Sequence, residues 1–216
     1  MRFPVCLLMF ALCVGAQKEN PVFAPVEDVA GLPRVLVIGD SISIGYTRPV
    51  RLLMKGKANV HRIPENAAHT RNGVEKISRW LASGKKWDLI HVNFGLHDLR
   101  RMDDGLWQVP VAEYEANLGK IFDVLAGTGA RLVFATTTPV PSAKVSPPRS
   151  DIDVELYNKA ARRVMEKRGV TVVDLYSLAL PRLAEVQIKA NVHFHPDGSD
   201  LLAGAVAAAW ERLLAR

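Results

Sequence analysis

The feature that most constrains the fold is the alternation of short β-branched apolar runs with longer stretches of helical periodicity. The short runs predict strands, and the longer stretches place apolar residues on one face of a helix. The predicted strands cover residues 34–40, 58–63, 87–95, 130–139 and 170–176. The predicted helices cover residues 72–83, 111–129, 153–169 and 198–216.

This alternation predicts the α/β class. Parallel strands need crossover connections, and helical crossovers cover both faces of the sheet. Right-handed crossovers then produce two helical layers. We therefore expect a three-layer α/β/α sandwich with a five-stranded parallel sheet, flavodoxin-like in arrangement, in one domain over residues 34–216. A hydrophobic content of 49% is enough to fill one such core.

The first residues have the pattern of a secretory signal peptide. Residues 1–16 contain one positive charge, Arg2, then an apolar run that ends in the small residues Val14-Gly15-Ala16. The run is too short to span a bilayer, so we expect no stable membrane insertion. Cleavage near Ala16 would give a secreted or periplasmic protein. Residues 17–33, polar and punctuated by proline, predict an extended lead-in.

Cysteine usage and charge exclude several classes of function. Both cysteines, Cys6 and Cys13, lie in the signal segment, and bulky Leu12 before Cys13 disfavours a lipoprotein. The mature chain would therefore lack disulfides, thiol nucleophiles and cysteine-ligated metals. Loss of Arg2 lowers the formal charge from +6 to +5, and the positive residues are scattered. We expect a solvated basic surface and no nucleic-acid partner.

Reactive side chains follow the predicted strands. Open α/β sheets bind ligands at the carboxyl ends of their strands. Gly-Asp-Ser at 39–41 follows the first strand, and Gly-Leu-His-Asp at 95–98 follows the third. His193 and His195 precede the last helix. A serine, a donor for an oxyanion and a histidine base are the groups that acyl transfer requires.

Each of these residues also has a simpler interpretation. Ser41 would serve as the N-cap of the next helix. The lipase motif G-x-S-x-G is absent, because position 43 is serine and not glycine. His97 would be a hydrogen-bonded loop residue. His193 and His195 would bind a metal, although a metal site needs a third ligand.

Together the motifs resemble those of the SGNH (GDSL) hydrolase family. "VLVIGDSIS" resembles the first block, in which the serine of GDS is the nucleophile. "GLHD" is similar to the third block, usually G-x-N-D. "VHFHPDG" resembles the last block, in which glycine follows the histidine by five residues, as Gly198 follows His193. The resemblance covers about residues 34–210, and "WDLIHVNFGLHDL", "TTTPVP" and "VHFHPDG" are similar to a secreted bacterial branch that carries GLHD.

The resemblance implies a serine esterase without metal or cofactor. Ser41 would attack the ester and His193 would take its proton, giving an acyl-enzyme that water hydrolyses. The oxyanion hole would consist of the N–H groups of Ser41 and Ala68 and the side chain of His97. The implied substrate is a small-molecule or carbohydrate acyl ester, short-chain or acetyl. No residue indicates the oligomeric state.

Two blocks depart from the family pattern around the oxyanion hole. The glycine of the second block is replaced in "PENAAHT" by Ala68, whose N–H serves if the backbone does not require positive φ. Asn66 is the second candidate, should the alignment slip. The asparagine of the third block is replaced by His97, whose imidazole N–H is an equivalent donor. Asp98 would orient His97 or cap the next turn.

The last block departs more seriously. The family usually has an aspartate three residues before the catalytic histidine, where this chain has Ala190. Three outcomes stay open. His193 would be supported by a backbone carbonyl or by Asn191, or Asp197 would reach it, or activity would be lost and the chain would be an SGNH-fold binding protein.

The identity of the base also has alternatives. His195, followed by Pro196, resembles a common His-Pro signature, whereas the spacing to Gly198 favours His193. A metal-dependent hydrolase built on His97, His193 and His195 is the remaining rival.

Overall fold

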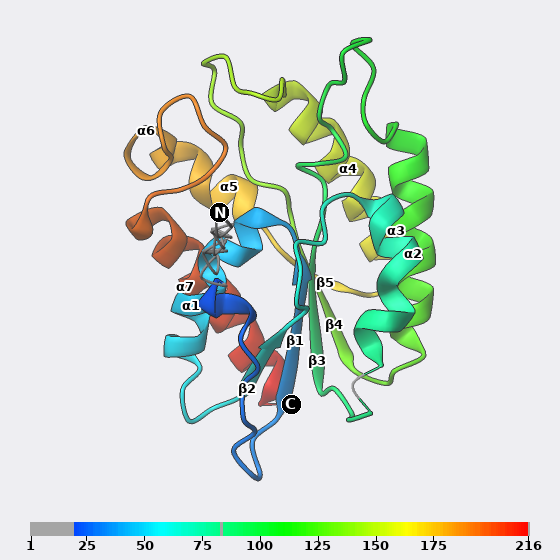
Figure 1. Cartoon of the computed structure of the whole chain (residues 1–216), viewed down its shortest axis with the longest axis vertical. Helices are drawn as coiled ribbons and strands as arrows, with labels where there is room; N and C mark the ends of the chain where they lie inside the picture. Colours follow the sequence, from blue (N-terminus) through cyan, green and yellow to red (C-terminus); the bar gives the residue numbers. More distant parts are fainter. Residues whose placement is uncertain (1–19, 83, 216) are drawn as a thin grey trace, which may run out of the picture.

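The computed structural model describes residues 20–82 and 84–215, so the expected signal peptide and the start of the lead-in lie outside the described residues. A parallel sheet forms the centre of the molecule (Figure 1), with strand order β2-β1-β3-β4-β5. Its strands are β1 (Arg34–Gly39), β2 (Asn59–Arg62), β3 (Leu89–Asn93), β4 (Arg131–Ala135) and β5 (Thr171–Val173). The expected five-stranded parallel sheet is confirmed.

Helices cover both faces of this sheet. Figure 1 shows α1, α5, α6 and α7 on one side and α2, α3 and α4 on the other. The helices are α1 (Ser41–Leu53), α2 (Thr70–Leu81), α3 (Val111–Ala126), α4 (Asp151–Lys167), α5 (Leu175–Ala179), α6 (Leu183–Val186) and α7 (Pro196–Leu214), with 3-10 turns η1 (Pro21–Phe23) and η2 (Leu180–Arg182). The three-layer α/β/α sandwich is confirmed. No helix in these described ranges is long and apolar enough to cross a membrane.

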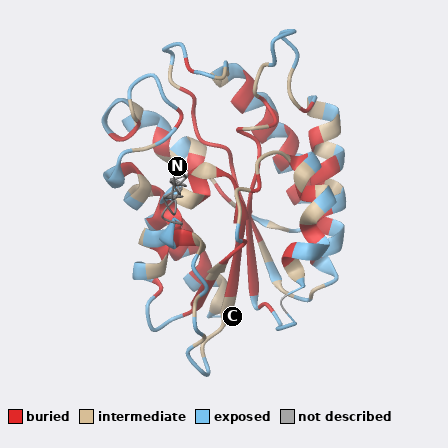
Figure 2. Cartoon of the chain, in the orientation of Figure 1, coloured by how far each residue is buried: buried red, intermediate tan, exposed pale blue. Residues whose placement is uncertain are grey.

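The core lies on both faces of the sheet. The central strands are buried along their length (Figure 2), which explains why their sequences are continuous apolar runs rather than alternating ones. The largest fully buried side chains include Tyr46 and Trp210, from the packed helices α1 and α7, and Phe122 and Phe134, which contact each other edge to face.

Helix α1 was expected only as the helix that Ser41 would cap, and its bounds were not predicted. Its sequence contains Gly45 and Pro49 together with β-branched residues, all of which lower helix propensity. The helix forms because Tyr46 and Val50, both 0% exposed, pack into the core, so that burial outweighs local preference. The predicted strands also extend too far at their carboxyl ends, where the chain continues as loops or, at Leu175 and Tyr176, as the start of α5.

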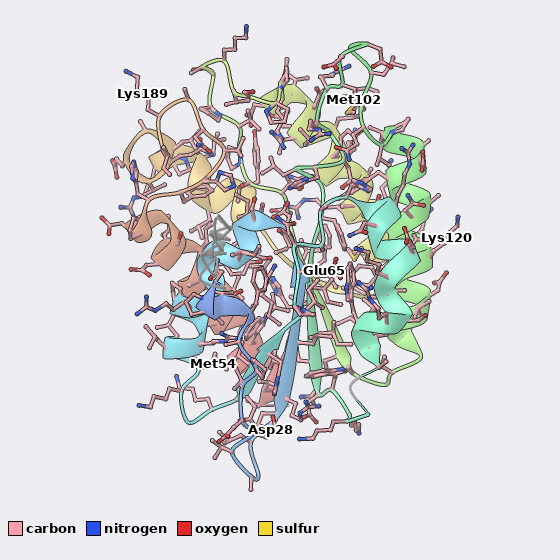
Figure 3. All side chains as sticks on the ribbon, viewed as in Figure 1. Asp28, Met54, Glu65, Met102, Lys120 and Lys189 are labelled. Carbon is pink, nitrogen blue, oxygen red and sulfur yellow. The ribbon has the colours of Figure 1, made fainter. Side chains whose placement is uncertain are left out.

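The strand order places the loops after β1 and β3 next to a crevice. From β1 the chain crosses to β2 on one side and then returns to β3 on the other side of β1. This reversal separates the loops that leave β1 and β3, and such a switch point is where open α/β sheets bind ligands. In Figure 3, Met102 and Lys189 mark this end of the molecule, and Asp28 marks the opposite end.

Candidate active site

Ser41 is the first residue of α1, directly after β1. The N-cap of this helix is Asp40, whose Oδ1 accepts a hydrogen bond from the N–H of Ile42 at 2.9 Å. The interpretation of Ser41 as the cap is therefore wrong. In the described part of the chain the N–H of Ser41 has no acceptor. It is left as a free donor at the positive end of the helix dipole.

His193 contacts Ser41 although the two residues lie far apart in the sequence. The Nε2 atom of His193 is 2.8 Å from Oγ of Ser41. The loop that carries His193 is closed by the N–H of Ile188, which donates to the carbonyl of His193 at 2.9 Å, and by a bridge between Gln187 and Phe194. This loop therefore brings an imidazole to the hydroxyl of Ser41 at the distance that proton transfer requires.

Asn191 holds the other side of the imidazole. Its Oδ1 lies 2.7 Å from Nδ1 of His193 and also accepts the backbone N–H of His193 at 3.0 Å. A backbone N–H can only donate, so the amide oxygen, not its NH₂ group, faces the ring. Nδ1 therefore carries the proton, and Nε2 is left as the acceptor for the hydroxyl of Ser41.

Three supports for His193 were left open, and among the described residues the contact with Asn191 is the one that forms. Asp197 lies exposed in the first turn of α7 and forms no hydrogen bond with His193 among the described residues. Ala190 is exposed with φ of +53°, a conformation that turns the chain so that the next residue reaches the ring. Desolvation, and then the positive charge of Arg149, lower the pKa of His193, so the imidazole is uncharged at neutral pH.

His97 lies in the loop after β3, half-buried. Gly95 opens this loop with φ of +141°, and a Cβ there would lie 2.0 Å from Oγ1 of Thr137, so the turn requires glycine. The ring of His97 has no hydrogen-bond partner in the described ranges. Burial, followed by the positive charges of Arg149 and Arg100, lowers the pKa of His97 to about 4. A neutral imidazole with one free N–H donor results.

Ala68 takes the left-handed conformation that the family's glycine would provide. Its φ is +55°, and this conformation is roughly 1–2 kcal/mol less stable for alanine than the usual right-handed one. We expected Ala68 to serve if this position did not require positive φ. The position does have positive φ, so that expectation is wrong. The N–H of Ala68 donates to Oδ1 of Asn66 at 2.9 Å, so it is already occupied. Ser41 and His97 are the two expected oxyanion donors that remain free.

Asp98 has neither of its two expected roles. It is 0% exposed, and its Oδ1 accepts from both the N–H of Thr70 at 2.9 Å and Oγ1 of Thr70 at 2.5 Å. It thus ties the start of α2 to the loop after β3, rather than orienting His97. Burial raises the pKa of Asp98 to about 7.

The comparisons with known proteins agree with this geometry. The model of the GDSL-like Lipase/Acylhydrolase family matches residues 37–201, most of the chain. The chain belongs to this family. As a GDSL-like acylhydrolase it is a carboxylic ester hydrolase. A search of curated protein sequences found no match to it.

Solved structures of other hydrolases share the fold of this GDSL-like acylhydrolase. The lipase/acylhydrolase from Enterococcus faecalis has a TM-score of 0.71 and 19% identity, covering 84% of this chain and 96% of that one. An acetyl xylan esterase has a TM-score of 0.70 and 14% identity, with 82% and 98% covered. An acetylxylan esterase from Geobacillus stearothermophilus has a TM-score of 0.64 and 19% identity, with 85% and 94% covered.

Two arginines of this GDSL-like chain were missed by the sequence interpretation. Buried Arg62, at the end of β2, donates from Nη2 to the carbonyl of Gly39 at 2.7 Å and from Nη1 to Oγ of Ser43 at 2.8 Å. It thereby holds the backbone carbonyl of Gly39 before Ser41 and the side chain of Ser43 after it. An arginine inside a predicted apolar strand was the available signal. Arg149 donates from Nε to the carbonyl of Leu96 at 2.7 Å. In the sequence, only its place in the irregular loop 139–151 indicated that it could lie near the site.

His195 stays outside the contacts of this site. It is the exposed N-cap of α7, and its side chain makes no capping hydrogen bond. Over residues 20–82 and 84–215, no three histidine, cysteine or acidic side chains are arranged to hold a metal ion. The rival set of His97, His193 and His195 is therefore not brought together, and both nitrogens of His193 face other partners.

Proposed function

We propose that this GDSL-like hydrolase is a serine esterase that works through an acyl-enzyme on Ser41. The observation that carries the proposal is the chain of contacts from Oγ of Ser41 to Nε2 of His193 at 2.8 Å and from Nδ1 to Asn191 at 2.7 Å. A hydroxyl bonded to a neutral imidazole whose tautomer is fixed is the arrangement that activates serine.

The proposed reaction has two balanced steps. His193 takes the hydroxyl proton of Ser41 while Oγ attacks the ester carbonyl carbon, which forms a tetrahedral oxyanion. The C–O bond to the alcohol then breaks, and His193 gives its proton to the departing alkoxide. A water molecule then gives a proton to His193 while its oxygen attacks the acyl carbon. The bond between this carbon and Oγ of Ser41 breaks, His193 returns the proton to Oγ, and the acid is released.

The free N–H of Ser41 and the imidazole N–H of His97 are the proposed donors to the oxyanion. Such a donor typically lowers the barrier by roughly 3–4 kcal/mol. Because the N–H of Ala68 is bonded to Asn66, it joins the oxyanion hole only when the side chain of Asn66 turns away.

The proposed substrate is a short acyl ester, with acetyl groups on carbohydrate as the first candidates. Two of the structures with this fold are acetylxylan esterases, and the signal-like residues 1–16 favour a secreted or periplasmic enzyme. A series of p-nitrophenyl esters from acetate to octanoate tests the acyl preference, and acetate release from acetylated xylan tests the carbohydrate. Turnover that increases steadily to octanoate would contradict a short-chain enzyme.

An SGNH-fold binding protein without activity is the second candidate, and its support was Ala190. The contact of Asn191 with His193 weakens that support, because the ring is oriented without an aspartate. A serine-reactive phosphonate that labels the natural chain but not Ser41→Ala would favour the enzyme. Absence of labelling in both would favour the binding protein.

A further inference from the structure

Arg149 places a guanidinium beside the proposed oxyanion donor His97. Its Nε donates to the carbonyl of Leu96, the residue before His97, at 2.7 Å, and its Nη1 donates to the carbonyl of Pro147 at 3.0 Å. An arginine has five N–H groups. Two are used here, and one on Nη1 and two on Nη2 have no acceptor among the described residues.

The charge of Arg149 is also not neutralised by a direct ion pair, and the opposing charge that acts on it is that of buried Asp40. No carboxylate in the described ranges lies within ion-pair distance of it, whereas Arg71, Arg101 and Arg163 each have one. Arg149 is half-buried, so water screens its charge only in part. Its positive charge also lowers the pKa of both His97 and His193, so Arg149 acts electrostatically on both imidazoles.

Arg149, which is bonded to the loop of His97, also lines a cavity of about 510 Å³. A second cavity of about 510 Å³ shares part of that lining and extends to Ala190, next to Asn191. We call the two together the loop groove. Residues common to both cavities are Pro141, Ser142, Ala143, Leu180 and Leu183.

The loop groove combines an apolar lining with cationic side chains. Leu180 is 44% exposed and Ile152 is 79% exposed, so its rim carries apolar surface open to a ligand. Lys144 lines the same cavity as Arg149, and Lys189 lines the second cavity. The acidic lining residue, Asp151, is already bonded through Oδ1 to the N–H of Val140 and through Oδ2 to the hydroxyl of Tyr176.

We propose that the loop groove is a substrate subsite in which Arg149 binds a carboxylate carried by the ester substrate. The proposal rests on the serine esterase function proposed above. The free Nη1 and Nη2 donors form the fork that matches the two oxygens of a carboxylate. A monoanion fits this place better than a dianionic phosphate, because the carboxylate of Asp151 lies on the same wall.

The carboxylate can belong to the acyl part or to the alcohol part of the substrate, and two pairs of probes separate these sources. For the acyl part, p-nitrophenyl hemisuccinate is compared with p-nitrophenyl butyrate. For the alcohol part, 4-acetoxybenzoate is compared with 4-acetoxybenzamide. In each pair the ratio of kcat/KM for the anionic ester to that for the neutral ester is measured. This ratio cancels any damage that a variant does to His97 or to the fold.

We expect one of the two ratios to fall about 10- to 100-fold in Arg149→Gln, the usual effect of losing a charged hydrogen-bond partner. Arg149→Lys, which keeps the charge but not the fork, is expected to give an intermediate ratio. Arg100→Gln is the matched control. It removes a charge that also acts on His97 but does not line the groove, and we expect it to leave both ratios unchanged.

Equal ratios in the natural chain and Arg149→Gln would overturn the subsite, even if all esters are hydrolysed more slowly. Failure of the natural chain to hydrolyse any of the four esters would instead refute the esterase function. In that case the protein is titrated with hexanoate and with hexanamide, and binding is measured by NMR. This experiment still tests whether the loop groove binds a carboxylate. Binding of hexanoate that is stronger than that of hexanamide and is lost in Arg149→Gln supports the subsite, and equal binding of both overturns it.

Discussion

The side-chain oxygen of Asn191 lies 2.7 Å from Nδ1 of His193, in a triad position that SGNH hydrolases usually fill through an aspartate. The amide fixes the tautomer as a carboxylate would, but it brings no negative charge. The imidazolium that forms during catalysis is therefore less stabilised. This agrees with the lowered pKa of His193, which burial and the positive charge of Arg149 cause without any opposing acid.

Replacing Asn191 separates orientation from charge. Asn191→Ala removes the contact that fixes the tautomer, and we expect kcat to fall by about 10²- to 10⁴-fold, as in triads that hold the wrong tautomer. In Asn191→Asp the carboxylate raises the pKa of His193, so the acid limb of the kcat/KM profile moves to higher pH. The measurement is a pH–rate profile of the three proteins, and an unmoved acid limb in Asn191→Asp would contradict the contact.

Ser41 carries the proposed covalent step, so Ser41→Ala is expected to abolish ester hydrolysis. Stability is expected to change little, because Asp40 rather than Ser41 caps α1. The checks are turnover of p-nitrophenyl acetate and the melting temperature, which we expect within a few degrees of that of the natural chain. Unchanged turnover would exclude the mechanism.

The two histidines before α7 are expected to differ sharply. Loss of the base costs about as much as loss of the nucleophile in related triads. We therefore expect His193→Ala to lower kcat by several orders of magnitude, while exposed His195→Ala has a much milder effect. Steady-state kinetics of both variants decides between them, and a worse defect in His195→Ala would mean that the base was assigned to the wrong residue.

His97 is expected to act in the transition state. His97→Ala should lose roughly 10²- to 10³-fold in kcat with little change in KM. His97→Asn should retain substantial activity, because its amide N–H restores a donor. A loop histidine with a packing role would instead lower the melting temperature in both variants and leave kcat per folded molecule unchanged, so both quantities are measured.

Asp98 is expected to make stability depend on pH. Burial raises its pKa from 3.8 to about 7, so the folded protein holds the proton more tightly than the unfolded chain. This contribution to stability is complete below pH 3.8 and is lost as pH rises through about 7. Asp98→Asn keeps the acceptor for Thr70 but cannot ionise. We expect a smaller difference in melting temperature between pH 5 and pH 8 in this variant, and an equal difference would contradict the assignment.

The sheet could be predicted from the sequence because fully buried parallel strands are continuous β-branched runs. The positions of Ser41, His97 and His193 followed, since parallel strands bring their carboxyl ends to one edge and the family motifs mark the residues there. The bounds of helix α1 could not be predicted, because the helix is stabilised by the burial of Tyr46 and Val50 rather than by local propensity.

The finer parts of the site depend on tertiary contacts that no local pattern shows. Asn191 was one of several candidates until the backbone N–H of His193 fixed its amide oxygen. The attachment of Asp98 to Thr70 joins segments 28 residues apart. The carbonyl that Arg149 holds belongs to Leu96, 53 residues away. Side-chain partners at such separations leave no periodic signal.

The proposed catalytic residues lie on two parts of the molecule that are held with different firmness. Ser41 and His97 leave the central strands β1 and β3, whereas His193 and Asn191 lie on an exposed loop. That loop is tied to the body by the side chain of Gln187, which donates to the carbonyl of Pro139 at 2.8 Å. Segments with few buried contacts open at lower free energy than the core. Heating is therefore expected to detach the base while the sheet is intact, so that turnover falls reversibly at temperatures below the melting of the secondary structure.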